Sequence, residues 1–165
     1  MTIETAGAEV TAHRLVLSAV SPMLKAALSG RWGEPSRVRA SSSSAEAVSL
    51  LLDLAYSGTS ARDFDHKLAL EALDLAHEWQ CDSIVLMLEG ALVPLITNAS
   101  FEAIALAAAV KELVPLREAC ARYAKISDEV GVNLDNKKYG AAVQDMLRPP
   151  KKGAEQPAKR PRRSF

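Results

Sequence analysis

A histidine and a cysteine four residues apart are the first candidates for chemistry in this sequence. His77 and Cys81 fall in a segment with helical periodicity, and the i, i+4 spacing places both on one helix face, where they could supply two zinc ligands. A structural zinc site needs four ligands, and only Cys120 and two distant histidines remain. We therefore favour His77 as a core or boundary residue of a buried helix face, and we expect no metal and no cofactor.

The motifs of the common enzyme classes are missing from the sequence. There is no Gly-rich phosphate loop, no G-x-S-x-G elbow and no pair of C-x-x-C knuckles. Catalysis by His77 and Cys81 as a nucleophilic pair is disfavoured, because no activating or orienting group is implied. A small metal-dependent enzyme remains a remote alternative, and the sequence predicts a protein that acts by binding rather than an enzyme.

The net charge of zero divides into an acidic body and a strongly basic tail. From Arg148 onward seven basic residues accompany one acid, Glu155, which leaves 13 basic and 19 acidic residues in the first 147. An acidic body is a poor match for a phosphate backbone, so we expect no specific nucleic-acid binding. Four prolines and almost no apolar residues before Phe165 predict a disordered tail over 149–165.

One basic run in the tail fits the short pattern that nuclear import receptors recognise. The residues of this run are Lys159, Arg160, Arg162 and Arg163. Two other interpretations stay open: a generic solvated tail, and weak non-specific contact with nucleic acid that added salt would abolish. An import receptor is thus one expected partner of the chain.

The sequence also predicts the compartment. No apolar run approaches the roughly 18 residues that a membrane helix needs, so we expect no membrane partner. The N-terminus lacks the basic and then apolar segments of a secretory signal, which predicts a reducing compartment, nuclear or cytoplasmic or both. In that setting Cys81 and Cys120 are expected to be buried thiols rather than a disulfide.

The elements that position these residues begin with a small sheet. Weak alternation around Gly7 predicts a β-hairpin over the first dozen residues, and Arg37-Val38-Arg39 alternates like a short edge strand with its charges outward. Ser21-Pro22 is a helix start, with serine as N-cap and proline in the first turn, and predicts a short helix over 22–28.

Helical periodicity dominates the remainder. An apolar stripe from Val48 to Tyr56 ends at Ser57-Gly58, and Ser43-Ser44-Ala45-Glu46 fits a capping box at its start. Further helices are predicted over 67–79, 84–93, 99–113, 116–125 and 139–147. The fold class is therefore α+β, a small N-terminal sheet flanked by a cluster of α-helical hairpins, with an α-solenoid as a rival on pattern alone.

Three segments, in order, resemble the BTB/POZ family. Val10 to Leu28 is similar to its opening strand followed by A-H-[RK]-x-x-L-x-x-x-S-x-x-[FL], and Val48 to Gly58 is similar to L-L-x-x-x-Y-[ST]-G. Ala69 to Leu86 resembles the family's leucine-rich helix and the C-x-x-x-L-type helix that follows it. The resemblance implies a BTB/POZ domain over 1–124, a post-BTB helical extension over 125–148, and the tail beyond.

BTB domains are protein-interaction modules, commonly dimeric, and many are substrate adaptors of cullin-3 ubiquitin ligases. The resemblance therefore implies a homodimer that joins cullin-3 to an unknown substrate protein. The extension and the basic tail are similar in place to those of speckle-type POZ adaptors, without the MATH domain. The implied dimer residues are His13, Leu15, Val16 and Ala19, and the implied cullin-binding residues are Trp32, Glu34, Asp82, Val85 and Leu86.

Two alternatives stay open within this resemblance. Trp32-Gly33-Glu34 corresponds to the hydrophobic-x-Glu loop that inserts into the cullin in adaptors, but Trp32 could instead fold back onto the body. The chain could also be a nuclear transcriptional co-regulator or scaffold, dimerising through the helix from His13 to Ala19 without a ligase role. Dependence on the ligase separates these two functions.

Overall fold

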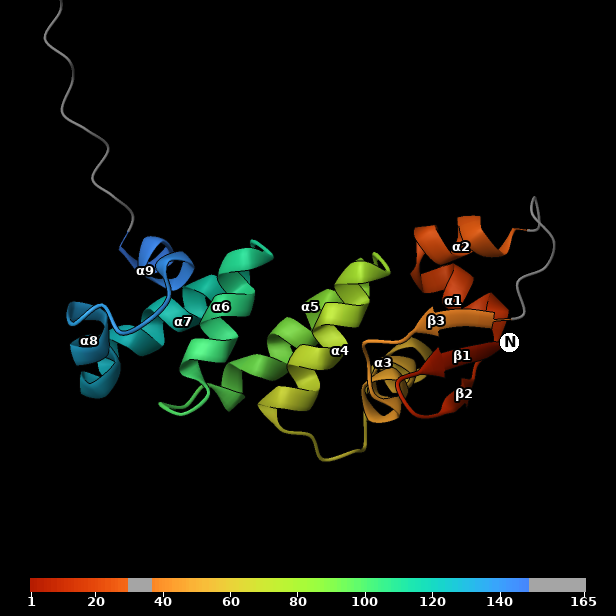
Figure 1. The fold of residues 1–165 in the computed structure, drawn as a ribbon, viewed down its shortest axis with the longest axis horizontal. Coiled ribbons are helices and arrows are strands. Elements are labelled where there is room, and N and C mark those ends of the chain that lie inside the picture. Colours follow the sequence, from red (N-terminus) through yellow and green to blue (C-terminus); the bar gives the residue numbers. More distant parts are fainter. Residues whose placement is uncertain (30–36, 149–165) are drawn as a thin grey trace, which may run out of the picture.

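The computed structural model describes residues 1–29 and 37–148. The molecule is elongated, with a small sheet at one end and helical hairpins following one another along the long axis (Figure 1). Of the part described, the elements are β1 (Thr2–Thr5), β2 (Glu9–Thr11), α1 (Arg14–Val20), α2 (Pro22–Leu28), β3 (Arg37–Ala40), α3 (Ala45–Ser57), α4 (His66–Glu78), α5 (Asp82–Leu92), the 3-10 turn η1 (Val93–Leu95), α6 (Phe101–Val110), α7 (Val114–Ile126), α8 (Asp128–Asp135) and α9 (Ala141–Leu147). This arrangement confirms the predicted α+β class.

The sheet has the strand order β2-β1-β3, with β1 antiparallel to β2 and parallel to β3. Ile3 is fully buried, whereas the guanidinium of Arg37 lies 2.8 Å from a carboxylate oxygen of Glu4 on the exposed side. The hydrogen bond from Arg37 holds the pKa of Glu4 below its usual value. The predicted hairpin and the predicted edge strand with outward charges are both confirmed.

Ser21 joins α2 to the end of α4. Its Oγ accepts a hydrogen bond from the backbone N–H of Leu24 at 2.9 Å, as predicted for an N-cap followed by proline. The same hydroxyl donates to the carbonyl of Trp79 at 2.5 Å, and both residues are buried. One serine therefore starts a helix and also satisfies a buried carbonyl 58 residues away.

The start of α3 differs from the predicted capping box. Ser44, not Ser43, is the N-cap and accepts from the N–H of Ala47 at 3.1 Å, so Glu46 falls one position too early to bond back. The carboxylate is instead supplied by Glu71 of α4, which accepts from the backbone N–H of Ser44 and, at 3.0 Å, from its hydroxyl. The other end agrees with prediction, because Gly58 closes the helix with φ of 73°.

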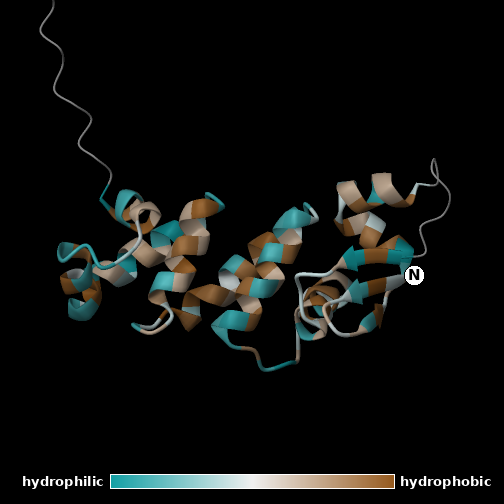
Figure 2. Cartoon of the chain, in the orientation of Figure 1, coloured by the Kyte–Doolittle hydropathy of each residue, from teal (hydrophilic) through white to brown (hydrophobic). Residues whose placement is uncertain are grey.

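The core is continuous from the sheet into α9. Figure 2 shows polar and apolar residues on different sides of α4, as expected for a helix that packs on one side, whereas α6 is apolar over most of its length. Phe101 of α6 is fully buried and lies between two rings, with centroids 5.9 Å from Tyr123 and 5.4 Å from Tyr139. Val130 and Val143 are also fully buried, so α8 and α9 share this core.

Asn98 fixes the extension at its base. Its side-chain oxygen accepts from the hydroxyls of Tyr123 and Ser127, each at 2.8 Å, and its side-chain nitrogen donates to Glu129 at 2.6 Å. With Asn98 used in this way, α6 starts at Phe101, two residues later than predicted. Because α7 continues to Ile126, the domain boundary predicted at residue 124 falls inside a helix.

We predict that Glu71→Ala lowers the free energy of unfolding by about 1–2 kcal/mol, because it leaves the partly buried Ser44 N–H and hydroxyl without their acceptor. Urea unfolding followed by circular dichroism measures this change. Glu78→Ala, on the exposed side of the same helix, is the matched control and should change stability by less than about 0.5 kcal/mol. Equal effects for the two variants would contradict the assigned role of Glu71.

Candidate functional site

The predicted His77–Cys81 pair does not form a site. The helix α4 ends at Glu78 and Gln80 takes a φ of 55°, so Cys81 lies outside the helix that carries His77. The imidazole is exposed, which also corrects its expected place in the core, whereas Cys81 is fully buried. Burial raises the pKa of the Cys81 thiol to about 11, so it stays protonated at neutral pH.

No cluster suited to metal binding is found within residues 1–29 and 37–148. No three His, Cys, Asp or Glu side chains in these ranges lie close enough together to hold an ion. Cys120 is likewise a fully buried thiol, and burial raises its pKa to about 11.

The first candidate surface lies on α1. Leu15 is 82% exposed, His13 and Ala19 are exposed, and Val16 is half-buried, whereas Leu17 on the opposite side is fully buried. Three of the four predicted dimer residues are thus exposed, and they lie on α1 or, for His13, at its N-cap. We call His13, Leu15, Val16 and Ala19 the α1 surface. Within it, the side chain of Leu15 is almost fully exposed to solvent.

Tyr56 of α3 holds the start of the α1 surface in place. Its hydroxyl oxygen accepts from the backbone N–H of His13 at 2.8 Å and lies 2.7 Å from Nδ1 of the same residue. The two rings meet edge to face with centroids 5.7 Å apart. Sequence periodicity placed Tyr56 in an apolar stripe, but it is 48% exposed and acts through its hydroxyl.

The second candidate surface lies on α5. Asp82 is exposed, Leu86 is 62% exposed, and Met87, which the sequence did not single out, is 39% exposed. Val85 differs from expectation, because it is only 8% exposed and belongs to the core. It shares the buried side of the helix with Leu88, so it offers a partner almost no surface. We call Asp82, Leu86 and Met87 the α5 surface.

Several predicted residues lie outside the described part of the chain. Trp32 and Glu34 fall in 30–36, and the basic run falls in 149–165. The described structure therefore neither places Trp32-Gly33-Glu34 beside the α5 surface nor separates them. Their proposed roles stay predictions.

Glu89 is a buried acid that sequence reasoning missed. It is 4% exposed, and its Oε2 has no hydrogen-bond partner among the described residues. Burial raises the pKa of its carboxyl group, and the N–H of Leu116 at the start of α7 partly offsets this effect. Its spacing from Val85 and Leu92, at i, i+4 and i+7, places it on the buried side and was a usable signal.

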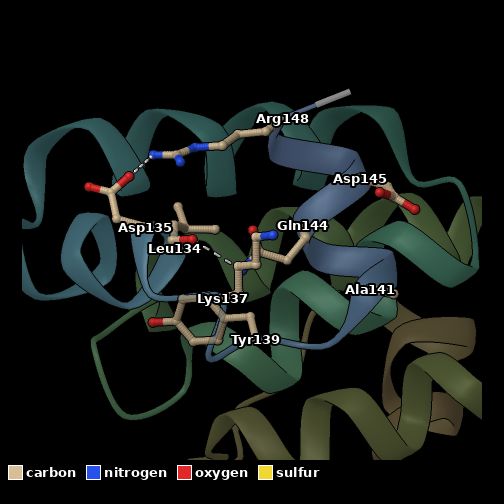
Figure 3. A pocket seen from close by; sticks show the side chains of 8 residues that line it. All are labelled: Leu134, Asp135, Lys137, Tyr139, Ala141, Gln144, Asp145 and Arg148. Carbon is tan, nitrogen blue, oxygen red and sulfur yellow. Dashed lines mark hydrogen bonds and ion pairs between the residues drawn. The ribbon is translucent and has the colours of Figure 1, made fainter. Parts of the chain in front are cut away.

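Several hollows lie on the described part of the chain, including one polar and one apolar example between helices. Between α8 and α9, a polar hollow of about 460 Å³ is bordered by the Arg148–Asp135 ion pair at 2.5 Å and by Gln144, which donates to the carbonyl of Leu134 at 3.3 Å (Figure 3). Between α4 and α6, an apolar groove of about 330 Å³ is bordered by the ion pair of Lys111 with Asp74 at 2.9 Å. Neither contains a group arranged for catalysis.

Comparison with known proteins gives one assignment. A model of the BTB/POZ domain matches residues 1–94, from β1 into η1. No curated protein matches the chain. The match identifies an interaction domain and does not distinguish a subfamily, so the likeness to speckle-type POZ adaptors stays a prediction. Within the described ranges, none of the helices is long and apolar enough to cross a bilayer.

We predict that Glu89→Gln flattens the pH dependence of stability. Because the folded-state pKa of Glu89 lies above the ordinary value of 4.5, the carboxyl group favours folding below pH 4.5 and loses that contribution as pH rises through the folded-state pKa. The glutamine variant keeps a neutral side chain throughout and should be at least as stable as the parent at pH 7. Urea unfolding at several pH values between 4 and 8 measures the difference; a steeper profile for the variant contradicts the assignment.

Proposed function

This chain belongs to the BTB/POZ domain family of protein-interaction modules, and on that basis we propose that it is a dimeric substrate adaptor of a cullin-3 ubiquitin ligase. The observation that carries the proposal is the presence of two separate accessible apolar surfaces on one domain, on α1 and α5. An adaptor has to engage a second copy and a ligase at the same time, which requires two such surfaces.

The α1 surface supports self-association. A twofold dimer brings the same surface of each copy together, so each exposed apolar residue of this surface is buried in both copies. Burying Leu15, now 82% exposed, would favour association by about 1.5–3 kcal/mol per copy. The contacts of Tyr56 with His13 hold the start of this helix in one position, which lowers the entropy lost on docking.

The α5 surface is the proposed cullin contact within the described residues. Leu86 and Met87 supply an apolar centre, and Asp82 supplies a charge at its rim, the arrangement typical of a protein interface. Trp32 and Glu34, by their resemblance to the hydrophobic-x-Glu loop, would add an anchor and a second rim charge. The helix α7 packs on both α5 and α8, and the extension that follows it would widen the contact.

A nuclear co-regulator or scaffold without a ligase role is the second candidate. The basic run that includes Lys159 and Arg162 favours it, because an import signal implies work in the nucleus. Both candidates use the α1 surface for dimerisation and differ in their need for the α5 surface. An unknown substrate protein is required by the adaptor function and not by the scaffold.

We predict that Leu15→Asp converts the chain from a dimer to a monomer, because each copy would have to bury an unpaired carboxylate in the interface. Light scattering coupled to size exclusion measures the mass. Val132→Asp on α8, where the native side chain is 55% exposed, is the matched control and should leave the dimer intact. A dimer that survives Leu15→Asp excludes the α1 surface as the interface.

We predict that Leu86→Arg lowers affinity for the N-terminal region of cullin-3 at least about tenfold, as expected for an apolar residue near the centre of an interface. Titration calorimetry with the full chain measures the affinity. Leu106→Arg on α6, 45% exposed in the parent, is the control for a charge added at an exposed apolar site. Trp32→Ala combined with Glu34→Ala should also weaken binding.

If the parent chain does not bind cullin-3, the adaptor function is rejected in favour of the scaffold. If Leu86→Arg binds as tightly as the parent, the α5 surface is not the contact.

A further inference from the structure

Four consecutive serines, Ser41 to Ser44, join β3 to α3, and two arginines precede them. Arg37 and Arg39 stand five and three residues before Ser42. Among all serines and threonines of the chain, Ser42 alone has an arginine or lysine at the third preceding position. Spacing of this kind matters because kinases choose substrates partly by the pattern of charge around the target residue.

We propose that Ser42 is a phosphorylation site for a protein kinase that recognises arginine three and five residues before its target. The inference is independent of the adaptor function, because it rests on the β3–α3 corner and not on the α1 or α5 surface. It assigns a modification to a segment that neither proposed interface uses.

Exposure and hydrogen bonding distinguish Ser42 from the other serines of the run. Ser43 is only 4% exposed, and Ser44 is occupied as the N-cap of α3 with its N–H and hydroxyl held by Glu71. Ser41 and Ser42 are both exposed and lie in a turn outside β3 and α3. Ser41 has Val38 at its third preceding position, which leaves Ser42 as the one serine of the run with both access and the arginine spacing.

The side chains of the two arginines are accessible to the substrate-binding site of a kinase. Both lie in β3, at an edge of the sheet, where the extended backbone directs alternate side chains to one side. The side chains of Arg37 and Arg39 are 61% and 83% exposed. Their ion pairs with Glu4, at 2.8 and 3.4 Å, are on the solvent-exposed surface, where such pairs are weak, so carboxylates of a kinase can replace them.

The chemical step is an ordinary phosphoryl transfer from ATP. The Oγ of Ser42 forms a bond to the γ-phosphorus, the bond from that phosphorus to the β–γ bridging oxygen breaks, and ADP leaves with the electron pair. The hydroxyl proton passes to the catalytic aspartate of the kinase. The product is a phosphoserine with a charge near −2, placed two residues before the Ser44 cap.

The test incubates the folded full chain with ATP and a kinase that requires arginine at the third preceding position, and maps the product by tandem mass spectrometry. We expect one modified residue, Ser42, and a rate at least about tenfold lower for Arg39→Gln, because a charge-assisted contact is lost. Ser41→Ala should be modified at the parent rate, and Ser42→Ala should not be modified. Arg62→Gln, at an exposed arginine away from this corner, is the matched charge control.

Three outcomes overturn the proposal. The first is modification of a synthetic peptide spanning 35–46 while the folded chain is left unmodified, which would mean that the fold hides the site. The second is modification at Ser41 or another residue in place of Ser42. The third is an Arg39→Gln variant that is modified as fast as Arg62→Gln, which would mean that the arginines are not read. Circular dichroism of each variant verifies that it is folded.

Discussion

Burial of one side of α5 constrains most of this molecule. Ile84, Leu88 and Leu92 are almost fully buried, and the helix packs against α1, α3, α4 and α7, so it belongs both to the matched domain and to the base of the extension. Fixing the inner side determines what the outer side can present, namely Asp82, Leu86 and Met87. The same constraint explains Val85 and Glu89. Val85 is buried in the core and cannot contact a partner, and the carboxyl group of Glu89 lies where burial disfavours its charged form.

Polar contacts between distant segments set the angles at which the elements meet. The pairs Ser21–Trp79, Ser44–Glu71 and Tyr56–His13 each join residues that are tens of positions apart; the first contact is buried and the second is partly buried. Apolar packing is tolerant of small rotations, whereas a buried hydrogen bond is lost when its geometry changes. These contacts therefore give the domain a defined shape, and with it two surfaces in a fixed relation to each other.

Local signals predicted a large part of this fold, and partners from elsewhere in the chain account for most of the errors. Proline at the start of α2, the glycine that ends α3 and the alternation of β3 each act within a few residues, and each was predicted correctly. The capping box at Glu46 and the shared helix of His77 and Cys81 were wrong, because Glu71 competes for the first and the turn at Gln80 interrupts the second. Periodicity alone did not distinguish an interface from a core for Val85, and the dimer role that the family resemblance implies for the α1 residues stays a prediction.

The stacking of Phe101 with Tyr123 and Tyr139 has a thermodynamic consequence. The segment matched by the family ends at residue 94, yet its last helix packs against α7. In turn α7 packs against α6 and α8, and α6, which carries that phenylalanine, packs against α9. Loss of α8 and α9 would destabilise α7, and water would then reach the apolar side of α5. We therefore expect the domain and its extension to unfold together, so that the length of chain needed for folding exceeds the length that defines the family.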